Sequence, residues 1–358
     1  MNNNYIWDII ASTDKIIVFY GTGDGADKIA LQIESLGKTI SGYFVSDDFY
    51  RPNKMFRGKE IMTFSQAEKQ FGDFLCIVAF GSRLDNVIKN IESIRQLKET
   101  YIPDMPLCGK ELFDKTFFQN NHEKYNKVQK LLCDDYSRKT LDNIINFRLT
   151  GNADYLYDCQ CSDDEYKSIL NKDYSAYADL GAYTGDTLKK AVSDYPNLKI
   201  AVCMEPSEKS FGKLAEYANS LVEPDTIIVN AAAWDCNETG TFSDSGGRGS
   251  KITNNKSKSL SGAKSIEVEY MPLDQVCEIH NEKLLIKYDV EGAELRALKG
   301  SVNTIKNNDT DLEISVYHRS GDIFDIPIYV HELLPSHKLF LRKLSGVPAW
   351  DILLYAVK

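Results

Sequence analysis

Residues 284–300 read LLIKYDVEGAELRALKG, and this stretch decides the fold of the second half of the chain. Apolar residues open it and recur at helical spacing after Gly292, which predicts a buried strand that turns directly into a helix. Period-2 alternation puts Lys287, Asp289 and Glu291 on one side of the strand end, where a simple buried strand would carry only apolar residues. Open α/β sheets bind ligands at the carboxyl ends of their strands, so these charges indicate a functional site. The alternative is an ion pair that merely closes the strand.

The composition is that of a soluble globular protein with more than one domain. The chain has 358 residues, of which 43% are hydrophobic and 26% are charged, so two domains are the natural expectation. The formal net charge of -10 argues against a nucleic-acid partner and against an anionic membrane surface. We therefore predict a freely soluble protein with a large core and no nucleic-acid partner.

Targeting signals and cysteine motifs are not evident in the sequence. Residues 1–4, MNNN, lack the charge and the apolar run of a secretory signal, and the longest strongly apolar stretch, residues 74–80, is too short to cross a bilayer. The eight cysteines are scattered, and the close pair Cys159 and Cys161 lacks the two-residue gap of common zinc and redox motifs. We predict a cytoplasmic protein without membrane insertion, whose thiols are reduced and have no catalytic or metal-binding role.

The front of the chain opens with a strand and a glycine-rich turn. An apolar strand over residues 15–20 runs into GTGDGA at residues 21–26, and a helix follows. Its glycines, Gly21, Gly23 and Gly25, would let the backbone approach a phosphate at the N-terminus of that helix. The turn alone is a weak signal, because it fits only a loose G-x-G-x-x-A pattern.

Two more strands complete a small Rossmann-like domain over residues 1–110. They are expected at residues 40–45 and 74–80, and the first of them leads to Asp47, roughly where a ribose-binding acid belongs. This part resembles the small Rossmann-like domain found ahead of sugar acetyltransferases and of some methyltransferases. The resemblance implies either a nucleotide or nucleotide sugar at the glycine turn or a fold kept without a ligand.

A helical connector is expected over residues 111–172, because apolar residues recur there at near-helical intervals among charges and aromatics. The second domain, residues 173–358, opens with a strand that ends at Asp179 and is followed by Gly181 and Gly185. These glycines supply a backbone bend that a ligand can approach closely. The Asp-x-Gly-x-x-x-Gly pattern departs from dinucleotide motifs and resembles the first motif of S-adenosylmethionine enzymes.

The next two strands offer polar groups to such a donor. The strand over residues 200–204 ends at Glu205, a position that suits a carboxylate taking two ribose hydroxyls. The strand over residues 226–230 leads to Asn230 and Asp235, and either side chain could meet the adenine edge. A packed strand end followed by a turn is the open alternative for both.

The rest of the domain completes a regular α/β pattern around one polar interruption. Residues 237–265 are rich in Gly, Ser, Asn and Lys, and they predict a hairpin, a lid over the acceptor site or a solvated loop. Further strands are expected at residues 266–270, 284–288, 311–318, 337–344 and 350–357, with a helix at residues 325–334. The fold class is therefore α/β, with a C-terminal seven-stranded Rossmann-like methyltransferase sheet that ends in a strand pair, preceded by the smaller Rossmann-like domain and the connector.

Residues from about 150 to 358 resemble the FkbM family of methyltransferases. The motifs that carry the resemblance are DLGAYTGD (179–186), EP (205–206), PLD (272–274), IKYDVEGAE (286–294), LKG (298–300), SVYH (315–318) and WDILLY (350–355). The resemblance implies that the protein transfers a methyl group from S-adenosylmethionine to an oxygen, often a hydroxyl of a sugar or polyketide. We expect a sugar or a glycan precursor as the acceptor.

The resemblance also implies roles for single residues. The residues expected to bind the donor are Asp179, Gly181, Gly185, Glu205, Asn230, Asp235 and Asp289. Asp289, His318 and Lys287 are the catalytic candidates, and Glu291 and Glu294 are expected to hold substrate hydroxyls. His318 could be a base or a packed histidine, and Lys287 would orient Asp289 or Glu291. A divalent metal shared by Asp289 and His318, with Glu313 as a further ligand, is the alternative to a simple base, and no metal ligand is assigned.

Two other classes of protein remain as alternatives. An NAD-dependent oxidoreductase would use the glycine turn at Gly21, but the first turn of the second domain departs from G-x-G-x-x-G and no hydride-transfer residues are recognisable. A nucleotide-sugar-binding protein with a non-catalytic methyltransferase-like domain is the other. Against it, the glycines and acids of the donor side are all present.

Overall fold

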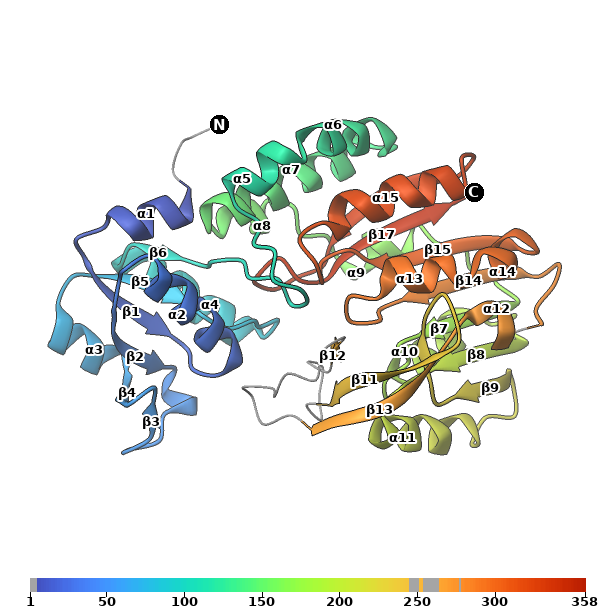
Figure 1. Cartoon of the computed structure of the whole chain (residues 1–358), viewed down its shortest axis with the longest axis horizontal. Coiled ribbons are helices and arrows are strands. Elements are labelled where there is room, and N and C mark those ends of the chain that lie inside the picture. The colour runs from blue at the N-terminus through green and yellow to red at the C-terminus, as the bar shows by residue number, and fades with distance from the viewer. Residues whose placement is uncertain (1–4, 245–250, 254–263, 277) are drawn as a thin grey trace.

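The computed structural model describes residues 5–244, 251–253, 264–276 and 278–358. Figure 1 shows one α/β unit at each end of the molecule, with the helices of the connector between them along one side. One hydrophobic core is continuous from the N-terminal sheet through the connector to the C-terminal sheet. None of the helices in the described part of the chain is long and apolar enough to span a bilayer.

The N-terminal unit is built on a six-stranded sheet in the order β3-β4-β2-β1-β5-β6, parallel except for β3. Its strands are β1 (Ile16–Tyr20), β2 (Ile40–Val45), β3 (Met55–Phe56), β4 (Lys59–Thr63), β5 (Phe74–Val78) and β6 (Thr100–Tyr101). Its helices are α1 (Ile6–Ser12), α2 (Asp24–Ser35), the 3-10 turn η1 (Asp47–Phe49), α3 (Phe64–Phe71) and α4 (Asp85–Leu97). The three strands expected from sequence are confirmed, but they are only half of the sheet. β3 and β6 have two residues each and β4 begins with exposed charges, so none of the three carries an apolar run.

The connector is helical, as its sequence pattern predicts. Its helices are α5 (Lys115–Asn120), α6 (His122–Leu131), α7 (Asp135–Thr150), α8 (Asp154–Tyr157) and α9 (Asp163–Lys167). Arg148 of α7 is buried against the ring of Phe113, and its Nε lies 3.1 Å from a carboxylate oxygen of the buried Asp104. This ion pair therefore fixes the chain that leaves the N-terminal sheet to the longest connector helix.

The C-terminal unit has the seven-stranded sheet that the sequence predicts, in the order β16-β17-β15-β14-β7-β8-β9. Its strands are β7 (Ala176–Leu180), β8 (Ile200–Met204), β9 (Asp225–Val229), β14 (Lys283–Tyr288), β15 (Asp309–Ser315), β16 (Lys338–Lys343) and β17 (Ile352–Val357). Only β17 runs antiparallel to its neighbours. The helices are α10 (Asp186–Asp194), α11 (Glu208–Ala218), α12 (Leu273–Val276), α13 (Glu294–Lys299), α14 (Val302–Lys306) and α15 (Asp322–Leu333).

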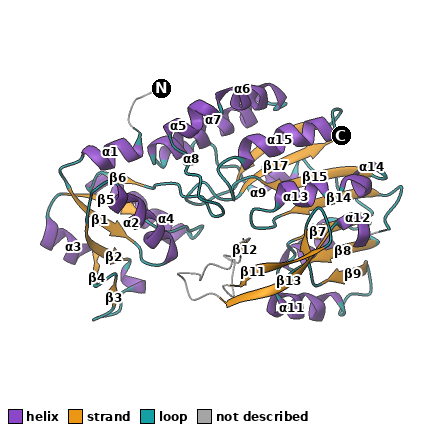
Figure 2. Cartoon of the chain, in the orientation of Figure 1, coloured by secondary structure: helices purple, strands orange, loops and turns teal. Residues whose placement is uncertain are grey.

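A second, four-stranded sheet accounts for the polar interruption of the pattern. It contains β10 (Ala232–Ala233), β11 (Glu238–Asp244), β12 (Lys251–Thr253) and β13 (Lys264–Met271), in the order β10-β13-β11-β12. β11 and β13 pair antiparallel side by side, as Figure 2 shows, so the hairpin interpretation is correct for the described part and the solvated loop is wrong. Residues 245–250 and 254–263 of this stretch lie outside the described residues, and its role as a lid stays a prediction.

The buried ion pair of the connector gives a test of how the two units are held. We expect Arg148→Met to destabilise the protein by about 3–5 kcal/mol, because the buried Asp104 carboxylate would lose its cation. Urea unfolding followed by fluorescence measures the loss. The control is Lys127→Met, which breaks the exposed pair with Glu332 and should change stability by no more than about 0.5 kcal/mol. Equal losses in both variants would contradict the assignment.

Candidate active site

A cavity of about 910 Å³ lies where the carboxyl ends of the central C-terminal strands face the N-terminal unit. The loops after β7, β8, β14 and β15 line it, and so do the start of α2 and the loop after β5. Parallel strands bring their carboxyl ends to one edge, which explains why motifs far apart in sequence meet here. The size is in the range of a ligand pocket for a drug-sized molecule, roughly 300–1,000 Å³.

Gly181, the first glycine after β7, is required because two strands approach each other closely at this position. Gly181 has φ +86, and an added Cβ would collide with the carbonyl oxygen of Asp289. The backbone N–H of Asp289 donates to the carbonyl of Leu180 over 3.0 Å, so β7 and β14 end side by side. Gly181 lines the cavity, whereas Gly185 does not. Gly185, with φ +83, lies against Leu214 of α11 and so serves helix packing.

Asp179 lies beneath the cavity and binds Lys287. The carboxylate is fully buried, accepts from the Lys287 ammonium over 3.0 Å and also pairs with the hydroxyl of Thr187. Burial lowers the pKa of Lys287, but the charges of Asp179 and Asp289 outweigh it and raise the pKa above its usual value. The hydrogen bonds of Lys287 go to Asp179 and to the carbonyl of Gly181, and not to the acids that sequence reasoning favoured as its partners. The reason is register, since Lys287 lies opposite Asp179 on the neighbouring strand.

Glu205 is a buried carboxylate on the wall of the cavity. One oxygen accepts the backbone N–H of Ser207 and the other that of Tyr183, both over 2.9 Å. Burial raises the pKa of Glu205 to about 7, although these two hydrogen bonds oppose the shift. Ala232 and Ala233 line the same cavity and leave room in it.

The structure does not bring Asn230 or Asp235 into the cavity. Asn230 is exposed, and its amide donates to the carbonyl of Glu205 over 2.8 Å. Asp235 pairs with Arg296 at 2.5 Å. Neither residue lines the cavity, so their contact with an adenine stays a prediction without geometric support.

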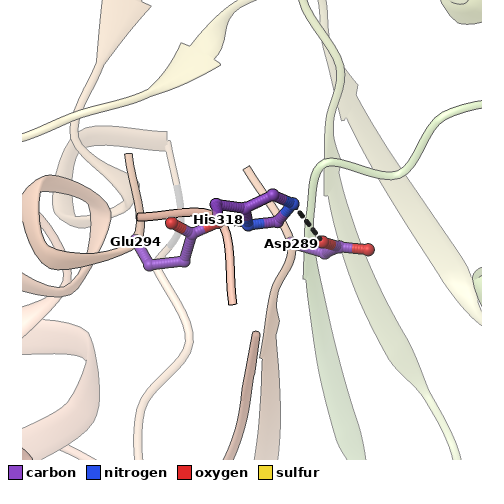
Figure 3. Close-up of side chains that lie close together, drawn as sticks. All are labelled: Asp289, Glu294 and His318. Carbon is purple, nitrogen blue, oxygen red and sulfur yellow. Dashed lines mark ion pairs between the residues drawn. The ribbon is translucent and has the colours of Figure 1, made fainter. Parts of the chain in front are cut away.

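Three acids and a histidine meet at the end of β14. His318 is 1% exposed, and Figure 3 shows its ring between Glu294 and Asp289. Its Nδ1 lies 2.8 Å from Glu294, while its Nε2 lies 3.6 Å from Asp289 and 3.5 Å from Glu291. Ser315 donates to the same oxygen of Asp289 over 3.0 Å. The ring thus joins the helix start to the strand end.

The carboxylates around His318 favour its protonated form. Burial would lower the pKa of His318, but the carboxylates of Glu294, Glu291 and Asp289 raise it to about 10. The ring is therefore an imidazolium at neutral pH. An imidazolium has no free lone pair, so the role of base predicted for His318 does not fit this charge state.

Glu291 and Glu294, both expected at the substrate, separate in the structure. Glu291 has φ +52 and lines the cavity. Glu294 is buried behind His318 and does not line it. One oxygen of Glu294 accepts the backbone N–H of Val290 over 3.0 Å and that of Gly292 over 3.3 Å. Glu294 therefore shapes the turn that presents Asp289 and Glu291.

Asp289, Glu294 and His318 are the one group in the described part of the chain whose ligand atoms lie close enough to hold a metal, within 4.8 Å of one another. Their arrangement does not fit one ion, because Glu294 faces Nδ1 of the ring and Asp289 faces Nε2. A ring nitrogen binds a metal along its own lone pair, so no ion in contact with one nitrogen could take both carboxylates. Glu313 is not part of the group.

The sequence analysis assigned no role to several residues that lie at or beside the cavity. Tyr317 and Trp350 line it, and both belong to motifs that the sequence analysis had recognised. Cys108, in the segment that follows β6, donates its backbone N–H to the carbonyl of His318 and its thiol to that of Glu291, both over 2.9 Å. Cys108 carries no sequence signal for this contact.

The glycine turn of the N-terminal unit also reaches this cavity. Gly25 lines it, and Gly25 lies against the carbonyl of Ala79. Gly21, with φ +109, packs on the ring of Phe80, and Gly23 caps α2 with open space around it. The turn is therefore formed as expected, but binding of a nucleotide there stays a prediction.

The sheet order, the antiparallel strand β17 and a cavity at the strand ends are features of a Rossmann-like α/β domain. Residues 179–342 match the family model of the methyltransferase FkbM domain, which confirms the resemblance seen in the sequence. This part of the chain is therefore similar to the FkbM methyltransferase domain.

Comparison with solved structures shows that the fold extends over both units. The methyltransferase FkbM from Methylobacillus flagellatus KT is 19% identical, with a TM-score of 0.72 over 98% of this chain and 92% of that chain. An rRNA methylase from Streptococcus thermophilus (14% identity, TM-score 0.33, 55% of this chain and 92% of that one) and fibrillarin from Aeropyrum pernix (12%, 0.31, 52% and 67%) are more distant and support no conclusion here. No curated protein sequence matches the chain.

The cation at His318 predicts how stability depends on pH. In the fold its pKa, about 10, lies above the ordinary 6.5, so its stabilisation is complete below pH 6.5 and is lost as the pH rises toward 10. At pH 6.5, His318→Gln should cost about 3–5 kcal/mol, because the buried Glu294 loses its partner. Thermal unfolding of both proteins across this range should show the difference shrinking as the pH rises.

The control for this series is His122→Gln, which removes an exposed histidine of α6 and should leave the unfolding curves unchanged. A difference between wild type and His318→Gln that stays constant up to pH 10 would contradict the imidazolium assignment.

Proposed function

We propose that the protein transfers the methyl group of S-adenosylmethionine to a hydroxyl oxygen of a sugar, a glycan precursor or a related metabolite. The observation that carries the proposal is that one cavity presents a buried carboxylate, Glu205, on one side and the cavity-facing carboxylates Asp289 and Glu291 on the other. S-adenosylmethionine, when bound, supplies a methyl group already activated by the positive charge of its sulfonium.

The donor half of the cavity is the part around β7 and β8. The Glu205 carboxylate keeps lone pairs beyond the two that accept backbone N–H groups, and these suit two ribose hydroxyls. Gly181 lines this half of the cavity and allows the close approach of the Asp289 backbone. The carboxylates at the end of β14 favour a sulfonium cation nearby.

The acceptor half is the part around Asp289. Its carboxylate is 38% exposed, and Figure 3 shows its second oxygen pointing away from His318. In the proposed step the acceptor oxygen attacks the methyl carbon, the carbon–sulfur bond breaks with its electron pair going to sulfur, and Asp289 takes the hydroxyl proton. His318 and Ser315 hold Asp289 in the orientation that this step needs.

Binding of S-adenosylhomocysteine is the first test of the proposal. Calorimetric titration should give binding that Glu205→Ala weakens by about 1–3 kcal/mol, because the ribose hydroxyls of the ligand lose their buried acceptor. The exposed Glu208→Ala is the matched control and should bind like wild type. Since the pKa of Glu205 is about 7, affinity should fall as the pH drops below 7, and Glu205→Gln should lose this dependence. Binding of NAD in place of S-adenosylhomocysteine would favour an oxidoreductase.

The role of Asp289 is tested by Asp289→Asn. We expect methyl transfer to fall by about 10²–10⁴-fold, as for loss of a general base, while S-adenosylhomocysteine binding changes little. The measurement is transfer of labelled methyl groups to a panel of sugars and glycan precursors. Asp309→Asn, an exposed acid at the start of β15, is the control. A rate like that of wild type would remove Asp289 from the mechanism.

A further inference from the structure

The segment between β16 and β17 forms a wall of the cavity on the side away from the donor half. Leu344, Val347, Trp350 and Asp351 of this segment line the cavity. In the sheet, β17 lies beyond β15 and β14, whereas Glu205 follows β8 on the other side of β7. A molecule that contacts Trp350 and reaches Asp289 therefore occupies the acceptor half.

Three consecutive residues of the N-terminal unit hold this wall. Ser82 and Val347 exchange two backbone hydrogen bonds, of 2.9 and 3.0 Å. Arg83 binds Asp351 through two nitrogens, with Nε donating over 2.6 Å. Gly81 packs on the indole of Trp350, where an added Cβ would collide with the ring and lie 2.7 Å from Cη2.

The segment is strained, and these contacts keep it in place. Asp351 has φ +56, a conformation that costs a non-glycine residue on the order of 1 kcal/mol or more and persists only when its surroundings enforce it. The ion pair with Arg83 supplies that constraint. From the other side, the buried ammonium of Lys343 donates to the carbonyls of Leu344 over 2.6 Å and Gly346 over 3.0 Å. The position of Trp350 is thus set jointly by both units.

We propose that Trp350 selects the acceptor and that Gly81 and Arg83 of the N-terminal unit position it. This inference rests on the proposed function, and the chemistry of the wall points to a neutral pyranose ring as the acceptor. The apolar C–H face of such a ring stacks on the indole, while its hydroxyls reach the carboxylates of Asp289 and Glu291. Trp350 is the specificity-determining residue, and Gly81 and Arg83 are positioning residues that need not touch the sugar.

Gly81→Ala isolates the positioning effect. Gly81 does not have a positive φ, so alanine should act only by displacing the ring of Trp350. Gly212→Ala in α11, where the added Cβ meets nothing within 4 Å, is the matched control. The chain has 3 tryptophans, so labelling with 5-fluorotryptophan gives one fluorine resonance for each. Trp350→Phe identifies the resonance of Trp350.

The experiment titrates the full chain, saturated with S-adenosylhomocysteine, with methyl glycosides of glucose, galactose, mannose, fucose and N-acetylglucosamine. At least one should shift the Trp350 resonance in a saturable way. Gly81→Ala and Arg83→Gln should move that resonance before any sugar is added and weaken sugar binding at least tenfold, with S-adenosylhomocysteine affinity unchanged.

Two results would overturn the inference while leaving the proposed function intact. One is normal S-adenosylhomocysteine binding with no glycoside response at Trp350. The other is a glycoside response that Gly81→Ala and Arg83→Gln leave as strong as in wild type and in Gly212→Ala. Failure of S-adenosylhomocysteine to bind would instead count against the proposed function.

Discussion

The buried ion pair between Asp179 and Lys287 joins the two central strands on which the site depends. It fixes the register of β7 against β14 in the middle of the sheet. Two residues after Asp179, Gly181 allows the ends of the two strands to come into contact. Removing either charge alone would leave the other buried without a partner, which is among the costliest changes a protein core can suffer. The bend after β7, which is the proposed donor site, and the strand end that carries Asp289 therefore share one electrostatic constraint.

Charge balance also organises the end of the cavity where the acceptor is proposed to bind. Glu294 uses one oxygen to hold the backbone of the turn after β14 and lies beside His318, whose cation in turn faces Asp289 and Glu291. The shape of the turn and the charge of the site are thus linked through one buried carboxylate. A neutral histidine would leave Glu294 as an uncompensated charge in the core. For this reason the acids raise the pKa of His318 by more than burial lowers it.

Local sequence patterns predicted the long strands and the strand-end position of Asp289 and Glu291, but not the partners of the charged residues. β5 and β8 were found because each is a continuous apolar run, and Asp289 and Glu291 were placed at a strand end by simple alternation. The partner of Lys287 depends on the register between strands 108 residues apart, which no local pattern encodes. The charge of His318 likewise depends on acids brought together by folding. The short strands of the N-terminal sheet lacked any apolar run to reveal them.

The cavity gives the N-terminal unit a physical reason to be kept, whether or not it binds a ligand of its own. Its loop after β5 meets the segment before β17 through the pair of Arg83 and Asp351, 268 residues apart, and the core is continuous between the units. In the proposed reaction a methyl donor with a reactive sulfonium is presented to one oxygen and shielded from water, and a site closed by a second unit excludes water better than an open sheet edge. The N-terminal unit supplies a wall of the cavity, and Gly25 lines the same cavity. Its position alone therefore helps to exclude water. The packing of its glycine turn against Phe80 and Ala79 then accounts for the shape of the turn, and no phosphate is needed to explain it.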